Sequence, residues 1–146
     1  MLIDIHTHKH SAPDQGTLTV SNVIVSKDSL YRTPCSVGIH PWYIDSDFEC
    51  QLDTLKLYLQ NDGVIAIGEC GLDKMTSTSW ENQLLAFEKQ IELANQINKP
   101  LIIHCVRSYS EVLSTLLAKQ NNVPILMHGF IKNWELAKTL LRHGYY

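Results

Sequence analysis

The chain has 146 residues, 45% of them hydrophobic and 18% charged, which excludes a disordered polymer and predicts one globular domain covering residues 1–146. A net charge of −3 excludes a protein that coats duplex nucleic acid through many Lys and Arg contacts. No apolar run reaches the roughly 18 residues of a membrane span, and the first residues do not resemble a secretory signal, so we expect a cytoplasmic protein without a membrane or an obligate protein partner.

The N-terminal third alternates short apolar runs with irregular segments. Leu2–Ile5 is the first strand-like run, rich in β-branched residues. Residues 9–22 and 26–35 contain Pro, Asp, Gly and Ser, and we expect them to form loops on either side of a short strand at Val23–Val25. Ser36–Ile39 is the next expected strand.

Amphipathic segments dominate the rest of the chain, because apolar residues recur in them at intervals of three and four. The expected helices are Asp47–Asn61, Ser79–Asn98, Ser108–Lys119 and Asn133–His143. Ser79 and Asn133 are expected to cap the N-termini of two of these helices, and Gly144 to follow the last one. The strand-like runs between the helices are Val64–Ile67, Leu101–Ile103 and Ile125–Met127, and Tyr145–Tyr146 resembles the start of another.

Strands that alternate with helices are typical of βαβ units and a parallel sheet. We count six expected strands, with a seventh beginning at Tyr145. The sequence therefore predicts an α/β fold of the TIM type, a (β/α)8 barrel that is incomplete with about six to seven strands, because a closed barrel needs eight strands and typically about 250 residues. An open doubly wound sheet is the alternative architecture.

The first strand carries two histidines at a spacing that suits metal binding. Successive side chains of a strand point to opposite faces, so Asp4, His6 and His8 share one face. Ile3 and Ile5 share the other face, which would pack under the helices. Two imidazoles at i and i+2 can reach one metal ion. Taken alone, such a pair is equally typical of polar residues on an exposed strand.

Three further side chains that can bind metal follow strand-like runs: Glu69, His104 and His128. Active sites of parallel barrels form at the C-terminal ends of the strands, so we expect these side chains to meet His6 and His8. Four imidazoles and one carboxylate exceed the three protein ligands of one open catalytic site. The set predicts two divalent metal ions, of which Zn, Mg and Mn are candidates, with Glu69 between them. Such a site activates water and suits hydrolysis of phosphate esters.

Five motifs in this sequence resemble those of the TatD family of metal-dependent deoxyribonucleases, which belongs to the amidohydrolase-like barrel superfamily. In chain order they are Leu2–His8, Val37–Pro41, Ala66–Asp73, Lys99–His104 and His128–Phe130. Their order is that of the family, and together they extend over essentially the whole chain. The resemblance implies that His6 and His8 hold one metal ion, that His104 and His128 hold the second, and that Glu69 bridges both as the catalytic carboxylate.

The resemblance also implies a substrate and a reaction. The reaction is metal-assisted hydrolysis of phosphodiester bonds, including exonuclease action on DNA. His40 and Arg107 would bind substrate, and Trp42, beside His40, is a candidate for stacking on a base. Two alternatives remain: an amide or ester hydrolase on the same scaffold, and a non-catalytic metal-binding fragment.

The sequence departs from the family pattern after His128. The last metal ligand of the family is an aspartate beyond a later strand, whereas the segment that follows His128 here contains Glu135, inside a helix pattern, and no aspartate. We therefore expect the chain to lack the C-terminal part of the family domain. A further departure is Lys74 after Asp73, where many relatives carry an aromatic residue, which indicates a different substrate preference.

Overall fold

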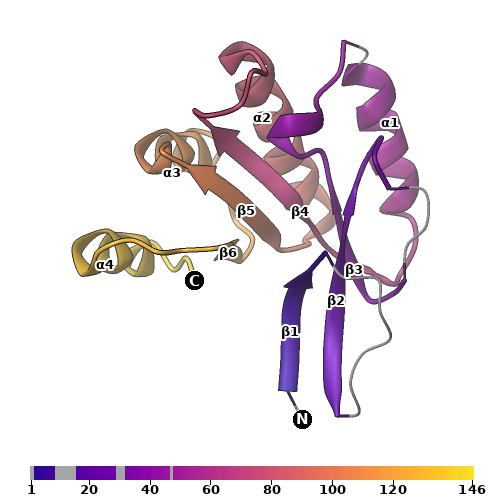
Figure 1. Cartoon of the computed structure of the whole chain (residues 1–146), viewed down its shortest axis with the longest axis horizontal. Helices are drawn as coiled ribbons and strands as arrows, with labels where there is room; N and C mark the ends of the chain where they lie inside the picture. The colour runs from indigo at the N-terminus through magenta and orange to yellow at the C-terminus, as the bar shows by residue number, and fades with distance from the viewer. Residues whose placement is uncertain (1, 9–15, 29–31, 47) are drawn as a thin grey trace.

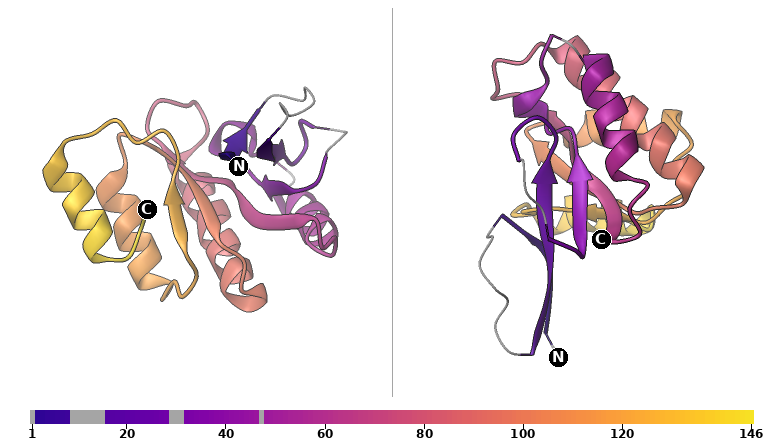
Figure 2. Two further views of the ribbon diagram at one scale, coloured as in Figure 1. Left: turned by 90° about the horizontal axis from the view of Figure 1, so that it is seen from below. Right: turned by 90° about the vertical axis from the view of Figure 1, so that its right-hand side faces the viewer.

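The protein is described by a computed structural model that covers residues 2–8, 16–28, 32–46 and 48–146. Within these residues six strands form one parallel sheet, in which each strand pairs with the next strand along the chain. The strands are β1 (Leu2–Thr7), β2 (Thr17–Ile24), β3 (Cys35–Gly38), β4 (Val64–Asp73), β5 (Leu101–Val106) and β6 (Ile125–Met127). Figures 1 and 2 show that the sheet is curled and that the helices lie along one side of it.

The order of the strands identifies the architecture. A doubly wound sheet reverses its strand order at a switch point, whereas this sheet keeps the order β1-β2-β3-β4-β5-β6, as a barrel does. The expected TIM-type (β/α)8 fold, incomplete with about six to seven strands, is therefore confirmed as a curled half-barrel, and the doubly wound alternative is excluded. Tyr145, the expected start of a seventh strand, forms an isolated parallel bridge with Ile125.

The helices lie where the apolar periodicity predicts them. They are α1 (Phe48–Tyr58), α2 (Trp80–Ile97), α3 (Tyr109–Ala118) and α4 (Trp134–Arg142), and a short 3₁₀ helix, η1 (Pro41–Tyr43), follows β3. The expected caps are confirmed: the Ser79 side chain accepts a hydrogen bond from the N–H of Asn82, and that of Asn133 accepts one from Leu136. Gly144 has the left-handed backbone that ends α4, with φ at +74°. None of the helices in the described residues combines the length and the apolar character that crossing a bilayer requires.

The hydrophobic core lies between the sheet and the helices. Leu101 and Ile103 of β5 are fully buried against Phe87 of α2, while the intervening strand positions face the other side of the sheet. A second cluster joins β2, β3 and α1 around Val37 and Leu55. Burial of each such side chain contributes about 1.5–3 kcal/mol to the stability of the fold. This packing on the helix side fixes the position of the strands, and their opposite face carries the polar residues of the site.

Two expectations for the N-terminal third are wrong. Residues 17–22 belong to β2 and not to a loop, because the Thr and Ser residues there alternate with apolar ones in a half-buried strand; the expected loop at 9–15 lies outside the described residues. Ile3 and Ile5 do not pack under helices and are 56% and 43% exposed. The described helices all follow β3, so none covers β1, and Ile5 instead lines an apolar cavity with Val20 and Ile102.

Candidate metal centre

The strands bring the expected ligands to one edge of the sheet. β4 and β5 continue beyond the apolar runs seen in the sequence, so Glu69 and His104 lie inside strands and not after them. His6 lies in β1, His8 directly beyond it, and His128 directly beyond β6. Because all these strands are parallel, their C-terminal parts meet on the same side of the half-barrel.

A glycine allows β4 and β5 to approach closely beside the site. Gly71 has φ at +140°, a conformation that other residues rarely adopt, and a Cβ atom there would overlap the carbonyl oxygen of His104. Gly71 is paired with His104 in the register of the two strands. The absence of a side chain at this position therefore permits the strand spacing that carries His104 to the site.

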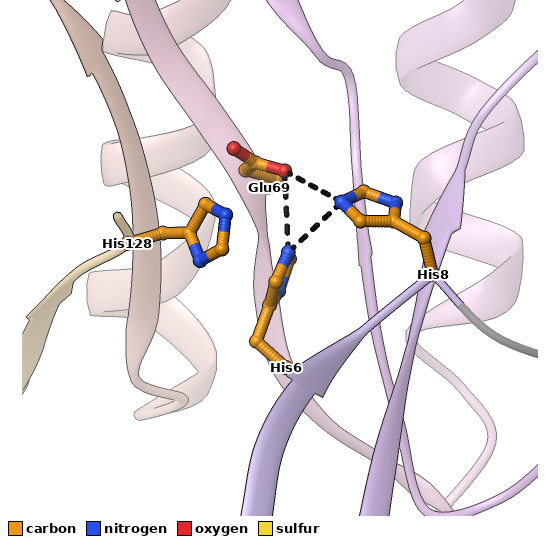
Figure 3. A group of neighbouring side chains, drawn as sticks. All are labelled: His6, His8, Glu69 and His128. Carbon is orange, nitrogen blue, oxygen red and sulfur yellow. Dashed lines mark hydrogen bonds and ion pairs between the residues drawn. The ribbon is translucent and has the colours of Figure 1, made fainter.

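Glu69 and three histidines form the first cluster, shown in Figure 3. Glu69 Oε2 lies 3.3 Å from His6 Nε2 and 3.5 Å from His8 Nε2, and these two nitrogens are 3.2 Å apart. The ring centroid of His128 is 4.0 Å from that of His6. One ligand atom from each of the four residues lies within 4.8 Å of the others, so small shifts would bring all four to one ion.

The other oxygen of Glu69 faces a second cluster. Glu69 Oε1 lies 2.8 Å from His104 Nδ1 and 3.9 Å from His40 Nε2, and these three residues form a second group with the spacing of metal ligands. Glu69 is 2% exposed and stands between the two groups. Its two carboxylate oxygens are therefore directed to different sets of imidazoles, which is the arrangement of a carboxylate between two cations.

This division of the histidines differs from the one that the family resemblance implies. His128 lies beside His6 and not beside His104, and His40, expected to bind substrate, lies beside His104, with ring centroids 4.4 Å apart. Both ring nitrogens of His104 face carboxylates, Nδ1 that of Glu69 and Nε2 that of Asp73. Arg107, also expected to bind substrate, is exposed, has a left-handed φ of +54°, and is not among the described residues that line the cavity at the site.

Asp73 holds the far side of the His104 ring. His104 Nε2 lies 2.9 Å from Asp73 Oδ2, which also accepts a hydrogen bond of 2.6 Å from Trp42 Nε1. Asp73 Oδ1 accepts a further bond of 2.7 Å from the backbone N–H of Met75. Histidines that bind metal commonly donate their second N–H to a carboxylate, which fixes the ring and its tautomer. Asp73 thus leaves Nδ1 of His104 directed at Glu69, a role that sequence reasoning missed although Asp73 ends a recognised motif.

Two buried glutamines of α2 fix the backbone beside the site. Gln90 Oε1 accepts a hydrogen bond of 2.8 Å from the N–H of Ile39, and Gln90 Nε2 donates one of 3.1 Å to the carbonyl of Ile39. Gln83 Oε1 accepts a bond of 2.8 Å from the N–H of Asp73, and its Nε2 donates to the carbonyl of Thr78. Sequence analysis gave neither residue a role, because the helix pattern considers only apolar positions.

Asn22 of β2 supports the site from the opposite side. It is 1% exposed, and its Oδ1 accepts hydrogen bonds from the N–H of Glu69 at 2.9 Å and from the Ser36 hydroxyl at 3.2 Å. Its Nδ2 lies 3.4 Å from His8 Nδ1. Sequence analysis missed Asn22 because it placed this residue in a loop, and a buried asparagine within an alternating strand is the signal that could have found it.

Hydrogen bonds keep both buried acids of the site ionised. Burial alone would raise the pKa of Glu69, but hydrogen bonds from His104 and His6 outweigh burial and hold that pKa well below its usual range. Burial likewise opposes ionisation of Asp73, and the bonds from His104 and Trp42 lower its pKa. Near neutral pH the site therefore contains two carboxylates, both able to balance positive charge.

The surroundings shift the pKa values of His40, His8 and His128 in one direction and that of His104 in the other. Burial, together with the neighbouring His104, lowers the pKa of His40 to about 4. Burial and the adjacent His6 lower the pKa of His8 and of His128. For His104, burial also lowers the pKa, but hydrogen bonds to Glu69 and Asp73 outweigh it and raise the pKa overall. Protons therefore compete with a cation more strongly at His104 than at His40, His8 or His128.

Both clusters open into a cavity of about 290 Å³. Its lining combines the histidines and Glu69 with side chains from η1 and from the end of β2: His8, Ile24, Lys27, His40, Trp42, Tyr43, Glu69, His104, Cys105, Val106, His128 and Gly129. The volume lies near the lower end of the range of roughly 300–1,000 Å³ found for ligand pockets. The polar groups therefore stand at a recess that a small substrate group can enter.

Residues 17–146 match the family model described as TatD related DNase. An uncharacterized metal-dependent hydrolase of Buchnera aphidicola is 33% identical over 113 residues, which are 76% of this chain and 42% of that protein. The 3'-5' ssDNA/RNA exonuclease TatD of Erwinia billingiae is 32% identical over 111 residues, 75% of this chain and 42% of the relative. The chain thus spans less than half the length of these relatives.

Solved structures show the same fold. A hydrolase TatD family protein from Entamoeba histolytica superposes with a TM-score of 0.75 at 18% identity, covering 99% of this chain and 63% of that one. The YJJV TatD homolog of Escherichia coli superposes with a TM-score of 0.74 at 21% identity, covering 87% of this chain and 54% of that one. At these identities the likeness concerns the fold alone.

Proposed function

The chain belongs to the TatD related DNase family, and we propose that it carries the metal centre of a metal-dependent hydrolase that cleaves phosphodiester bonds in DNA, as an exonuclease-type nuclease. One observation carries the proposal: the two oxygens of Glu69 face two separate groups of imidazoles at one cavity. The name of the Erwinia billingiae relative, a 3'-5' ssDNA/RNA exonuclease, supports the nuclease reading. Because the chain spans less than half of its relatives, catalysis by this polypeptide is part of the proposal.

The residues present fit two divalent cations. Neutral imidazoles and carboxylates are ligands for Zn and similar metals, and the buried Nδ1 of His6 has no hydrogen-bond partner among the described residues. His6, His8, Glu69 and His128 would hold one ion, and His40, Glu69 and His104 the other. Such ions, when bound, supply Lewis acidity and an activated water for hydrolysis.

The chain's own residues prepare the site for these ions. Glu69 is a buried carboxylate at neutral pH and offers one oxygen to each group. Asp73 orients the His104 ring, so that Nδ1 faces Glu69. His40 is neutral near neutral pH because burial lowers its pKa, and its Nε2 faces Glu69. Its Nδ1 accepts a hydrogen bond from the backbone N–H of Trp42. Rings held in this way lose little freedom when a cation or a phosphate enters.

Substituting Glu69 tests the metal centre directly. Glu69→Gln removes the charge shared by both groups, so we expect the content of bound Zn or Mn, measured by mass spectrometry of the purified protein, to fall for both ions. Glu135→Gln is the matched control, because Glu135 is exposed on α4 and its loss should leave metal content unchanged. Normal metal content in Glu69→Gln would contradict the site.

A substrate panel tests the reaction. Metal-loaded protein is assayed on a 5'-labelled single-stranded oligonucleotide, on bis-p-nitrophenyl phosphate and on p-nitrophenyl acetate. Stepwise shortening of the oligonucleotide that Glu69→Gln abolishes supports the nuclease. Turnover of the carboxylic ester alone would contradict the nuclease and indicate an ester hydrolase. Tight metal binding without turnover of any substrate would indicate the non-catalytic metal-binding alternative.

A further inference from the structure

The cavity wall formed by η1 carries an exposed aromatic ring that the metal centre does not use. Trp42 is 54% exposed, yet its Nε1 donates a 2.6 Å hydrogen bond to Asp73, which is 1% exposed. The ring centroid of Trp42 lies 5.2 Å from that of His40 and 5.8 Å from that of His104. Because its only polar atom is bonded to a buried carboxylate, this indole is fixed beside the metal centre before any ligand binds.

A cation and a phenol stand at the same cavity. Lys27 follows β2, and its Nζ lies 3.1 Å from the hydroxyl of Tyr43 and 4.7 Å from the centre of the Tyr43 ring. The ring centroid of Tyr43 is 5.7 Å from that of His40. Lys27, Tyr43 and Trp42 all line the cavity that contains the two clusters, and in Figure 1 η1 lies at the edge of the sheet to which the strand arrows point.

An aromatic face and an ammonium group at the same cavity as a candidate metal centre match the chemistry of a nucleotide. Bases of single strands stack on aromatic side chains, and Lys binds phosphate as a compact cation. The cavity volume of about 290 Å³ lies close to the range found for pockets that hold small ligands. The other two tryptophans, Trp80 and Trp134, lie on helices and do not line this cavity. Among the three tryptophans, all of which are described, Trp42 is therefore the one whose ring lines the cavity.

We propose that Trp42, Lys27 and Tyr43 form a nucleotide subsite, in which the base of the terminal nucleotide of a single strand stacks on Trp42 while Lys27 and Tyr43 bind a phosphate. This inference rests on the proposed function, because it places the scissile phosphate at the Glu69 clusters. It adds the residues that recognise the substrate: Trp42 for the terminal base, and Lys27 with Tyr43 for a phosphate.

Paired probes separate the base contact from the phosphate contact. Metal-loaded protein is titrated with phosphorothioate oligothymidylate, which resists hydrolysis, carrying either a normal or an abasic 3'-terminal residue. The unaltered protein should bind the normal end roughly 5- to 100-fold more tightly. Trp42→Ala should abolish this preference and Trp42→Phe should retain most of it. Trp134→Ala, which removes an indole that is 66% exposed, should leave it unchanged.

Lys27→Met tests the phosphate contact with the same probes. It should weaken binding of both equally and reduce the slope of log affinity against log salt by about 0.7, the value for one phosphate contact on a single strand. Equal binding of both ends by the unaltered protein, or a preference that survives Trp42→Ala, would overturn the base contact. An unchanged salt slope in Lys27→Met would overturn the phosphate contact.

The substrate panel distinguishes failure of this subsite from failure of the proposed function. If the base preference depends on Trp42 but no phosphodiester is hydrolysed, the subsite stands and the nuclease does not. If the oligonucleotide is hydrolysed while Trp42→Ala keeps the preference, the nuclease stands and the subsite does not. Metal content of Trp42→Ala and Trp42→Phe, measured in parallel, shows whether losing the bond to Asp73 has altered the second cluster.

Discussion

Gln90 is a buried side chain of α2 that hydrogen-bonds to the backbone at the end of β3. Gln90→Met removes these hydrogen bonds without changing the length of the side chain. Gln90 is fully buried, and its amide satisfies both the N–H and the carbonyl of Ile39. Each buried backbone group left without a partner costs about 1–3 kcal/mol, so the two together cost roughly 2–6 kcal/mol. The more apolar methionine offsets about 1–2 kcal/mol of this, which leaves a net loss of about 1–4 kcal/mol.

Urea unfolding followed by circular dichroism measures this loss as a change in the free energy of unfolding. Gln60→Met is the matched control, because Gln60 is exposed and the same substitution there should change stability by less than about 0.5 kcal/mol. Because Ile39 directly precedes His40, Gln90→Met should also weaken metal binding at the second cluster. A loss no larger than that of the control would refute the argument that this amide satisfies the strand end.

Three further predictions concern the second cluster and its support. As the pH falls from about 8 to about 4, metal content should drop first at this cluster. Hydrogen bonds raise the pKa of His104, whereas burial lowers the pKa of His128 in the first cluster. Protons should therefore displace metal from His104 at a higher pH than from His128. Simultaneous loss of both ions would argue against two distinct clusters. Asp73→Asn should weaken metal binding about 10- to 100-fold in calorimetric titration, since it removes the charge that orients His104, and unchanged affinity would contradict this role. Gly71→Ala should lower the free energy of unfolding by more than about 2 kcal/mol in urea, because its Cβ atom would overlap the carbonyl of His104, and a normal unfolding midpoint would show that β4 can shift.

The sequence indicated the side chains that meet at the candidate metal centre because their placement follows a local rule. Each of Glu69, His104 and His128 comes at or just after an apolar run, and parallel strands bring such positions to one edge. The helices could be predicted equally well, since apolar periodicity and the capping residues Ser79 and Asn133 are local signals. These features depend on neighbours within a few residues along the chain.

Features that depend on packing between distant segments could not be predicted in this way. The pairing of His128 with His6 joins opposite ends of the chain, and the shift of His40 into the second cluster depends on how β3 lies against β4. The first six residues of β2, 17–22, were missed because alternating Thr and Ser residues resemble a loop when the burial of Asn22 is unknown. In each case the deciding contact spans a large separation in sequence.

The choice of amides to support the site has an electrostatic reason. A buried backbone N–H and a buried carbonyl can both be satisfied by one Gln or Asn side chain, which offers a donor and an acceptor without a charge. Gln90 does this for β3, and Asn22 binds the N–H of Glu69 while facing His8. A carboxylate in place of the Asn22 amide would add negative charge beside Glu69, raise the pKa values of the nearby histidines and favour protons over cations. We therefore expect Glu69 and Asp73, and not their neutral supports, to set the affinity of the proposed metal centre for cations.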